Sequence, residues 1–264
     1  IYDLQNRRIG QIPFRNIFDS VPAPQKINLN NVVKYDDEHA WMVSGHQVAS
    51  CRISDECADV LHKSPVLKSL LGYGLKVGDA LYVCSEGGKL LRFRFDNLQP
   101  DTIPVPSAYY DHETKMEKLP DGNILLFMQG MHLAILSPKT GKIKEMKVAG
   151  MPEYGNFDPA FAKLDSYGNM WLGTKRDGLY LIDMKRKSMR SAKVLNDTHI
   201  EGMVEDRNRQ LWVTTMRDAF FVTSKSKVFM MSSLLSASQD RDDWQFYNNS
   251  ICLSPDGDVV FGSS

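Results

Sequence analysis

The residues of this chain that could do chemistry are scattered along it. Six histidines lie in different parts of the sequence, and none is spaced to share a metal ion locally: His39, His46, His62, His112, His132 and His199. The sequence contains no HExxH, GxSxG or P-loop motif, and no GxGxxG followed by an acidic residue. These patterns predict a protein that is not an enzyme and has no cofactor or metal. A catalytic or metal site built from several distant segments of the chain remains an alternative.

Two kinds of acidic segment invite a metal-binding interpretation. Asp111-His112-Glu113 is the densest cluster of ligand-type residues, but without a second cluster at a recurring spacing it is interpreted as a polar loop. The Asp-Gly segments at 121–122, 165–168 and 256–257 could supply calcium ligands. They are interpreted instead as β-turns, because turns favour Asp and Gly for backbone reasons.

The four cysteines are widely spaced and show no metal-binding pattern. Cys84 and Cys252 lie in apolar strand patterns, so we expect them to be buried thiols. Cys51 and Cys57 are close enough in sequence to form a small disulfide loop in an oxidising compartment. Whether any of the cysteines pair is left open, and they do not identify the compartment.

A repeated pattern of strands must position these residues. Residues 165–183 predict a polar turn, a strand at 170–174, a tight turn at 175–178 and a second strand at 179–182, which together form a hairpin. The layout recurs at 36–54, 77–95, 119–138 and 205–224, and the chain ends inside a further copy. One bulky residue occupies the equivalent position of each copy: Trp41, Tyr82, Leu125, Trp171, Trp212 and Val260.

The spacing of these bulky residues predicts the fold class. A period of about 40–50 residues, with several short strands in each unit, is typical of an all-β protein of the β-propeller type, built from four-stranded blades. We expect a single propeller domain over residues 1–264. It should have six blades, with seven as the alternative, and the N- and C-terminal strands should share the blade that closes the ring. The bulky residues should pack between neighbouring blades.

Composition and chain ends narrow the function classes. Lys and Arg together number 32, as do Asp and Glu, so no net charge attracts nucleic acid or an anionic membrane. No apolar run approaches the length of a transmembrane helix. The chain begins at Ile1 without Met or signal peptide and stops within a repeat, so we expect a piece of a longer multidomain protein.

Residues 55–72 are the least strand-like stretch of the sequence. A short helix is considered there, although Pro65 would interrupt it.

The predicted fold suggests where a ligand would bind. In a propeller, the turn between the second and third strands of each blade lies on one face of the ring. The connection from the outermost strand of a blade to the innermost strand of the next blade lies on the same face. Aromatic, amide and charged side chains on such a rim suit a polar, ring-shaped ligand. The candidate ligand-binding residues on this rim are His46, Gln47, Glu86, Lys89, Gln129, His132, Tyr109, Tyr110, Tyr154, Lys175, Arg176, Arg217, Asp218, His199, Trp244 and Tyr247.

The segment DSYGNMWLGTKRDGLYLID at 165–183 resembles the two-component regulator propeller repeat. The match is close there, clear over 205–222, recognisable over 119–138 and loose in the first two blades. In that family the repeat forms the periplasmic sensor region of hybrid two-component system histidine kinases, which control polysaccharide use. The resemblance implies a non-catalytic, periplasmic sensor of oligosaccharides or other small polar ligands. It also implies a neighbouring propeller or immunoglobulin-like domain of the same chain as partner, with a homodimer as a further option.

The sequence leaves three functions open. A sensor propeller that binds an oligosaccharide without chemistry is favoured. A propeller enzyme, such as a polysaccharide lyase or glycoside hydrolase, would need acid–base residues converging on the central pocket. A protein-interaction scaffold would instead present a large apolar patch and no deep pocket.

Overall fold

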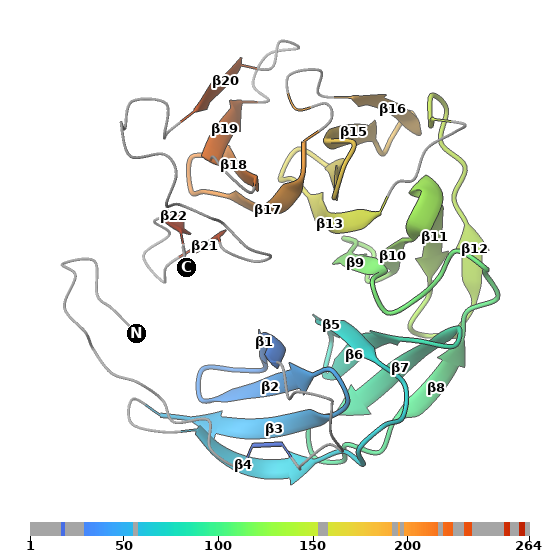
Figure 1. The fold of residues 1–264 in the computed structure, drawn as a ribbon, viewed down its shortest axis with the longest axis vertical. Coiled ribbons are helices and arrows are strands. Elements are labelled where there is room, and N and C mark those ends of the chain that lie inside the picture. Colours follow the sequence, from blue (N-terminus) through green and yellow to red (C-terminus); the bar gives the residue numbers. More distant parts are fainter. Residues whose placement is uncertain are drawn as a thin grey trace. The chain divides into compact units, whose positions relative to one another are not determined.

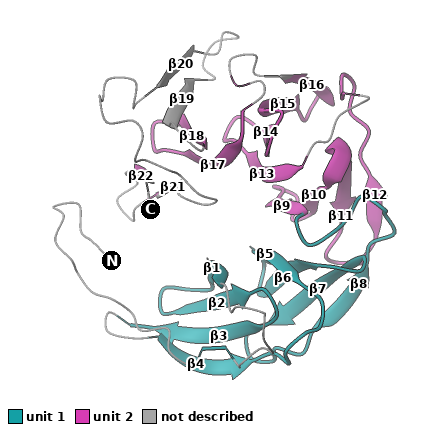
Figure 2. Ribbon diagram, viewed as in Figure 1, with its two compact units in different colours: residues 1–113 teal, residues 114–264 magenta. Residues whose placement is uncertain are grey.

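The structure is a computed structural model, shown as a ribbon in Figure 1. It describes residues 17–18, 29–54, 58–152, 158–191, 195, 198–215, 219–223, 230–233, 251–253 and 259–261. The described residues form antiparallel β-strands, β1 to β22, and one short 3-10 helix, η1 (Gln129–Met131). Within this part of the chain, no helix is both long and apolar enough to span a bilayer. The chain divides into two compact units, residues 1–113 and residues 114–264 (Figure 2).

Unit 1 contains two four-stranded antiparallel sheets, each with its strands in sequence order. The first comprises β1 (Leu29–Lys34), β2 (His39–Ser44), β3 (Val48–Ile53) and β4 (Ala58–Lys63). The second comprises β5 (Leu71–Val77), β6 (Ala80–Ser85), β7 (Lys89–Arg94) and β8 (Asp101–Pro104). In place of the helix considered for residues 55–72, residues 58–63 form strand β4, whose backbone pairs with β3.

Unit 2 contains three further four-stranded sheets and one strand pair. The sheets are β9 (Lys115–Lys118) to β12 (Ile143–Glu145), β13 (Pro159–Leu164) to β16 (Ser188–Ser191), and β17 (Ile200–Glu205) to β20 (Met230–Ser233). Their middle strands are β10 (Ile124–Phe127), β11 (Leu133–Leu136), β14 (Asn169–Thr174), β15 (Leu179–Asp183), β18 (Leu211–Thr215) and β19 (Ala219–Thr223). Strands β21 (Ile251–Leu253) and β22 (Val259–Phe261) form the pair. Each sheet has the predicted blade pattern, while the blade count and the ring closure stay predictions.

The predicted hairpin at 165–183 is confirmed, and its turn is closed by Thr174. The Thr174 amide and hydroxyl both donate to the Gly178 carbonyl at 3.0 Å, and the hydroxyl accepts a bond from the Asp177 amide at 2.8 Å. Gly178 has a φ of +82°, in the left-handed region that favours glycine. Ser44 closes the equivalent turn of the first sheet, where its hydroxyl donates to the Gln47 carbonyl at 3.0 Å. A hydroxyl residue ending the second strand thus fixes this turn in both sheets.

The Asp-containing turns also have a structural explanation. The Asp165 carboxylate accepts bonds from the amides of Tyr167 and Asn169, from the Asn169 side chain, and from the Trp171 indole N–H at 2.9 Å. Asp206 accepts from the Trp212 indole N–H at the same 2.9 Å. The Asp of these turns therefore orders the turn and also satisfies the indole of the bulky residue, which agrees with the turn interpretation.

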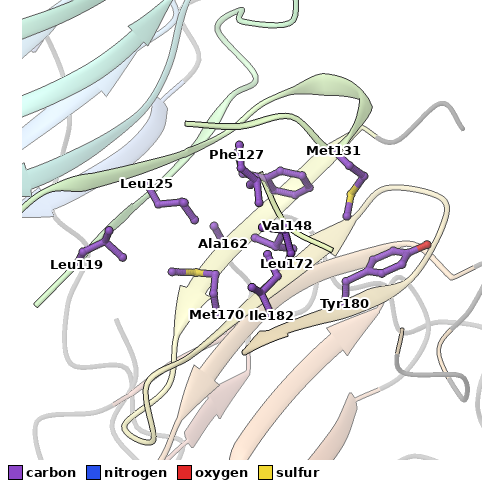
Figure 3. Packing of buried hydrophobic residues seen from close by; sticks show 11 residues of the cluster. Leu119, Leu125, Phe127, Met131, Val148, Ala162, Met170, Leu172, Tyr180 and Ile182 are labelled. Atoms are coloured by element: carbon purple, nitrogen blue, oxygen red, sulfur yellow. The ribbon is translucent and has the colours of Figure 1, made fainter. Parts of the chain in front are cut away.

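Three of the bulky residues, Trp41, Leu125 and Trp171, pack between neighbouring sheets, as predicted. Trp41 lies in a cluster with Leu71, Leu81 and Val83 of the next sheet, and Trp171 lies with Ile200, Leu211 and Val213 of the sheet that follows it. Figure 3 shows the equivalent cluster around Leu125, which joins two sheets of unit 2. The labelled residues are Leu119, Leu125, Phe127, Met131, Val148, Ala162, Met170, Leu172, Tyr180 and Ile182. Neither face of a blade could be buried without its neighbours.

The structure describes the side chains of two cysteines, Cys51 and Cys84. The Cys84 side chain is buried, as expected from its apolar strand. Cys51 is also buried and forms no disulfide. Burial raises the pKa of the Cys51 thiol to about 11, and the nearby Asp59 carboxylate acts in the same direction. Cys57 lies outside the described residues, and Cys252 lies in β21, where only its backbone pairing with Val260 is described.

Candidate functional site

Backbone hydrogen bonds join the segments that carry the predicted rim residues within each unit. In unit 1, the Leu67 amide donates to the His46 carbonyl and the Leu71 amide to the Gly45 carbonyl, both at 2.8 Å. In unit 2, the Gly178 amide donates to the Thr198 carbonyl at 3.1 Å. Each unit therefore brings a turn between second and third strands against the connection leading to an innermost strand. This is the arrangement expected for a rim.

Several predicted residues of unit 1 hold this rim together. His46 and Gln47 are buried, with the His46 ring 3.1 Å from the Leu67 carbonyl oxygen and the Gln47 side chain donating to the Ser64 carbonyl. The Tyr110 hydroxyl donates to the Lys89 carbonyl at 2.9 Å. Burial raises the pKa of the Tyr110 hydroxyl above its ordinary value.

The remaining predicted residues of unit 1 are more accessible. Lys89, at the start of β7, and Tyr109 are exposed. A Glu86 carboxylate oxygen accepts a bond from the Leu70 amide at 3.1 Å, and the other lies 3.8 Å from the His112 ring nitrogen Nδ1. Binding of a ligand by any of these residues stays a prediction.

In unit 2 the predicted residues lie on two turns and one connection. Gln129 begins η1, where Gly130 and Met131 both have left-handed backbone angles, and His132 follows it. Lys175 and Arg176 occupy the turn between β14 and β15. His199 immediately precedes β17. Tyr154, Arg217, Asp218, Trp244 and Tyr247 lie outside the described residues.

A residue that the sequence did not indicate, Glu201, lies beside the predicted rim residue His199. Glu201, the second residue of β17, is only 4% exposed. The register of β17 with β18 shifts between Ile200 and Gly202, which makes Glu201 the extra residue of a β-bulge. Bulges redirect side chains and are common beside binding sites. Gly202 was the available signal, because an isolated glycine in a strand pattern suggests a bulge.

The Glu201 carboxyl lies beside an imidazole and near two lysines. Its oxygen Oε1 is 3.4 Å from His199 Nε2, while Oε2 is buried and has no hydrogen-bond partner. Burial raises the pKa of Glu201, and the positive charges of Lys175 and Lys115 oppose this. Burial also lowers the pKa of His199, with Lys175 acting in the same direction. Both residues are therefore biased towards their neutral forms.

The other bulged positions show that a blade does not require an acid there. The register of β1 shifts at Asn30, whose side chain donates to the Leu71 carbonyl at 2.7 Å and so links neighbouring innermost strands. The register of β13 shifts at Ala160, which has no polar group to satisfy. The register of β5 shifts between Leu71 and Gly74, at Gly72 and Tyr73, so Glu201 is a buried acid where the bulges of β1, β5 and β13 have no acid.

Chemically, this site can accept and donate hydrogen bonds and can move a proton. A buried carboxyl oxygen without a donor is an acceptor for a ligand hydroxyl, and an adjacent neutral imidazole can act as donor or acceptor. No group of three or more His, Cys, Asp or Glu residues suited to a metal occurs within the part of the chain that the structure describes.

Comparison with known proteins gives fold similarity only. No family model matches the sequence, and no curated protein matches it. The extracellular domain of a hybrid two-component system from B. thetaiotaomicron has a TM-score of 0.70 at 12% identity, covering 94% of this chain and 33% of that chain. Another such domain has a TM-score of 0.58 at 13% identity, covering 91% and 38%.

A catalytically inactive virginiamycin B lyase from Staphylococcus aureus, with quinupristin, is also similar. It has a TM-score of 0.67 at 11% identity, covering 91% of this chain and 85% of that chain. These structures are of the propeller type, so the predicted fold class is confirmed. The resemblance of the repeat to two-component sensor propellers is likewise matched by similarity of fold to such extracellular domains.

Proposed function

We propose that this chain is a non-catalytic, ligand-sensing propeller from the extracytoplasmic, periplasmic part of a bacterial two-component signalling protein. The observation that carries the proposal is the buried Glu201 carboxyl on the rim of unit 2, which has an oxygen without a hydrogen-bond partner. The repeat at 165–183 and the fold similarity to extracellular two-component domains support the signalling context.

The proposed ligand is an oligosaccharide. Sugar hydroxyls supply the donors that a buried carboxyl oxygen lacks, and they also pair with the imidazole of His199. Leaving Glu201 Oε2 unsatisfied costs free energy, which a protein recovers when a ligand supplies the missing bond. A neighbouring domain of the same signalling chain would then read the bound state.

A propeller lyase or hydrolase is the second candidate, favoured by the same pair of residues. The 3.4 Å approach of His199 Nε2 to Glu201 Oε1 brings together two groups of the kind used for acid–base catalysis. The pKa shifts of both residues towards neutral forms suit proton transfer as well as hydroxyl binding.

The experiment that separates the two is a melting-temperature screen with cellotetraose, xylotetraose, mannotetraose and tetragalacturonate, followed by product analysis of the same samples. A ligand at a hundred times its Kd stabilises the fold by about 2.7 kcal/mol, which raises the melting temperature by about 5–10 °C. A selective rise with intact sugar supports the sensor. Cleaved sugar supports the enzyme, and the absence of any rise refutes oligosaccharide sensing in favour of an interaction scaffold.

A further inference from the structure

We infer that Glu201 and His199 form the recognition point for a hydroxyl group of an uncharged sugar, with the hydroxyl donating to Glu201 Oε2. The inference rests on the proposed function and specifies its ligand class. Its basis is that two buried polar atoms without hydrogen-bond partners, Glu201 Oε2 and His199 Nε2, lie on residues that are two positions apart.

The packing of the blade does not account for this acid. At the bulges of β1 and β13, the Asn30 side chain is hydrogen-bonded within the fold and Ala160 has no polar side-chain group, and the β5 bulge at Gly72 and Tyr73 has no acid. Glu117, a largely buried acid on the innermost strand β9, accepts a bond from the Leu164 amide at 3.0 Å and lies 3.7 Å from the Lys163 ammonium. Glu117 therefore links two innermost strands, whereas Glu201 Oε2 is left for a donor from outside the fold.

Charge selects an uncharged ligand. A bound anion is disfavoured because it would be a second acid beside the buried Glu201 carboxyl, and burying charge without a partner costs free energy. Lys115 and Lys175 act electrostatically on this same carboxyl, so they disfavour a cation. A hydroxyl group carries no charge and can both donate and accept, so it suits the carboxyl oxygen and the imidazole nitrogen together.

His199 is the more accessible of the two residues. The side chain of Glu201 is 4% exposed, whereas that of His199 is 30% exposed and lies against it. We expect a hydroxyl that reaches Oε2 to displace the His199 ring, which lies 3.4 Å from the other carboxyl oxygen. Binding should therefore move this ring, which gives the inference a readout other than affinity.

The test is calorimetric titration at pH 7.5 with cellotetraose, xylotetraose and mannotetraose as neutral probes and tetragalacturonate as the acidic probe. Glu201→Gln is the test variant, His199→Gln is a second variant, and Glu117→Gln is the matched control at a buried acid that is already hydrogen-bonded. We expect a neutral probe to bind, Glu201→Gln to weaken it at least tenfold, and Glu117→Gln to change it less than twofold. The NMR signals of the His199 ring should shift on binding in the wild type.

The outcomes separate this inference from the proposed function. Unchanged affinity of Glu201→Gln, preference for tetragalacturonate, or His199 signals that stay in place during binding would overturn the recognition point while leaving the sensor intact. If no probe binds the wild-type protein, the recognition point and the proposed oligosaccharide sensing are both refuted. Loss of binding in both Glu201→Gln and Glu117→Gln would indicate a general structural effect and would also count against the inference.

Discussion

Replacing Asp165 with alanine should strongly destabilise unit 2. The side chain is 3% exposed and accepts four hydrogen bonds, at 3.0, 2.8, 3.0 and 2.9 Å, the last from the indole of fully buried Trp171. A buried donor left without an acceptor costs about 1–3 kcal/mol, and bonds to a carboxylate are stronger than neutral ones. We therefore expect a loss of about 3 kcal/mol.

The measurement is thermal and urea unfolding of Asp165→Ala beside Asp121→Ala. Asp121 accepts bonds from the Asn123 amide and side chain in an equivalent exposed turn, where Leu125 takes the place of the Trp. We expect the melting temperature to fall by about 6–12 °C for the first variant. The second should lose about 1 kcal/mol, because water replaces its bonds.

A double-mutant cycle isolates the indole bond. Trp171→Phe removes the indole N–H, so in that background Asp165→Ala should cost about 1–2 kcal/mol less than in the wild type. Additivity within about 0.5 kcal/mol would refute the reasoning, because Asp165 and Trp171 would then act independently. Trp41 offers an internal comparison, since its indole Nε1 is buried without a partner and the Asp36 carboxylate of the preceding turn pairs with His39.

Three further predictions follow from burial and packing. Burial raises the pKa of Glu201 in the folded state, so ionisation of this carboxyl should reduce the stability of the fold as the pH rises above about 4.3, the ordinary pKa of Glu. Glu201→Gln should therefore have a higher melting temperature than the wild type at pH 8 and the same melting temperature at pH 4. Cys51, with a pKa of about 11 against an ordinary value of 9.0, should react with iodoacetamide about a hundredfold more slowly than an ordinary thiol at pH 8, as peptide mass spectrometry would reveal. Gly173→Ala should cost about 1–3 kcal/mol in urea unfolding because its new methyl group would overlap the Phe161 ring, whereas Gly45→Ala, with its nearest neighbour at 3.9 Å, should cost less.

The sequence determined the local structure because that structure depends on neighbours in the chain. The hairpin at 165–183, its Gly178 turn and its Asp165 turn follow from residue types at fixed short spacings. The burial of Trp41 and Trp171 followed from repetition, since a bulky residue at one place in every blade has only the next blade to pack against. The general positions of the rim turns followed from the same repeat.

Tertiary structure alone decided which rim residues stand out. His46, Gln47 and Tyr110 looked available in the sequence, yet each is buried and bonded to a backbone carbonyl from a distant segment. Glu201 looked like an ordinary strand residue, but a one-residue bulge turned it into a buried acid beside His199. Register and burial depend on partners far along the chain, which is why the local pattern could predict the turns but could not identify Glu201 as a buried acid.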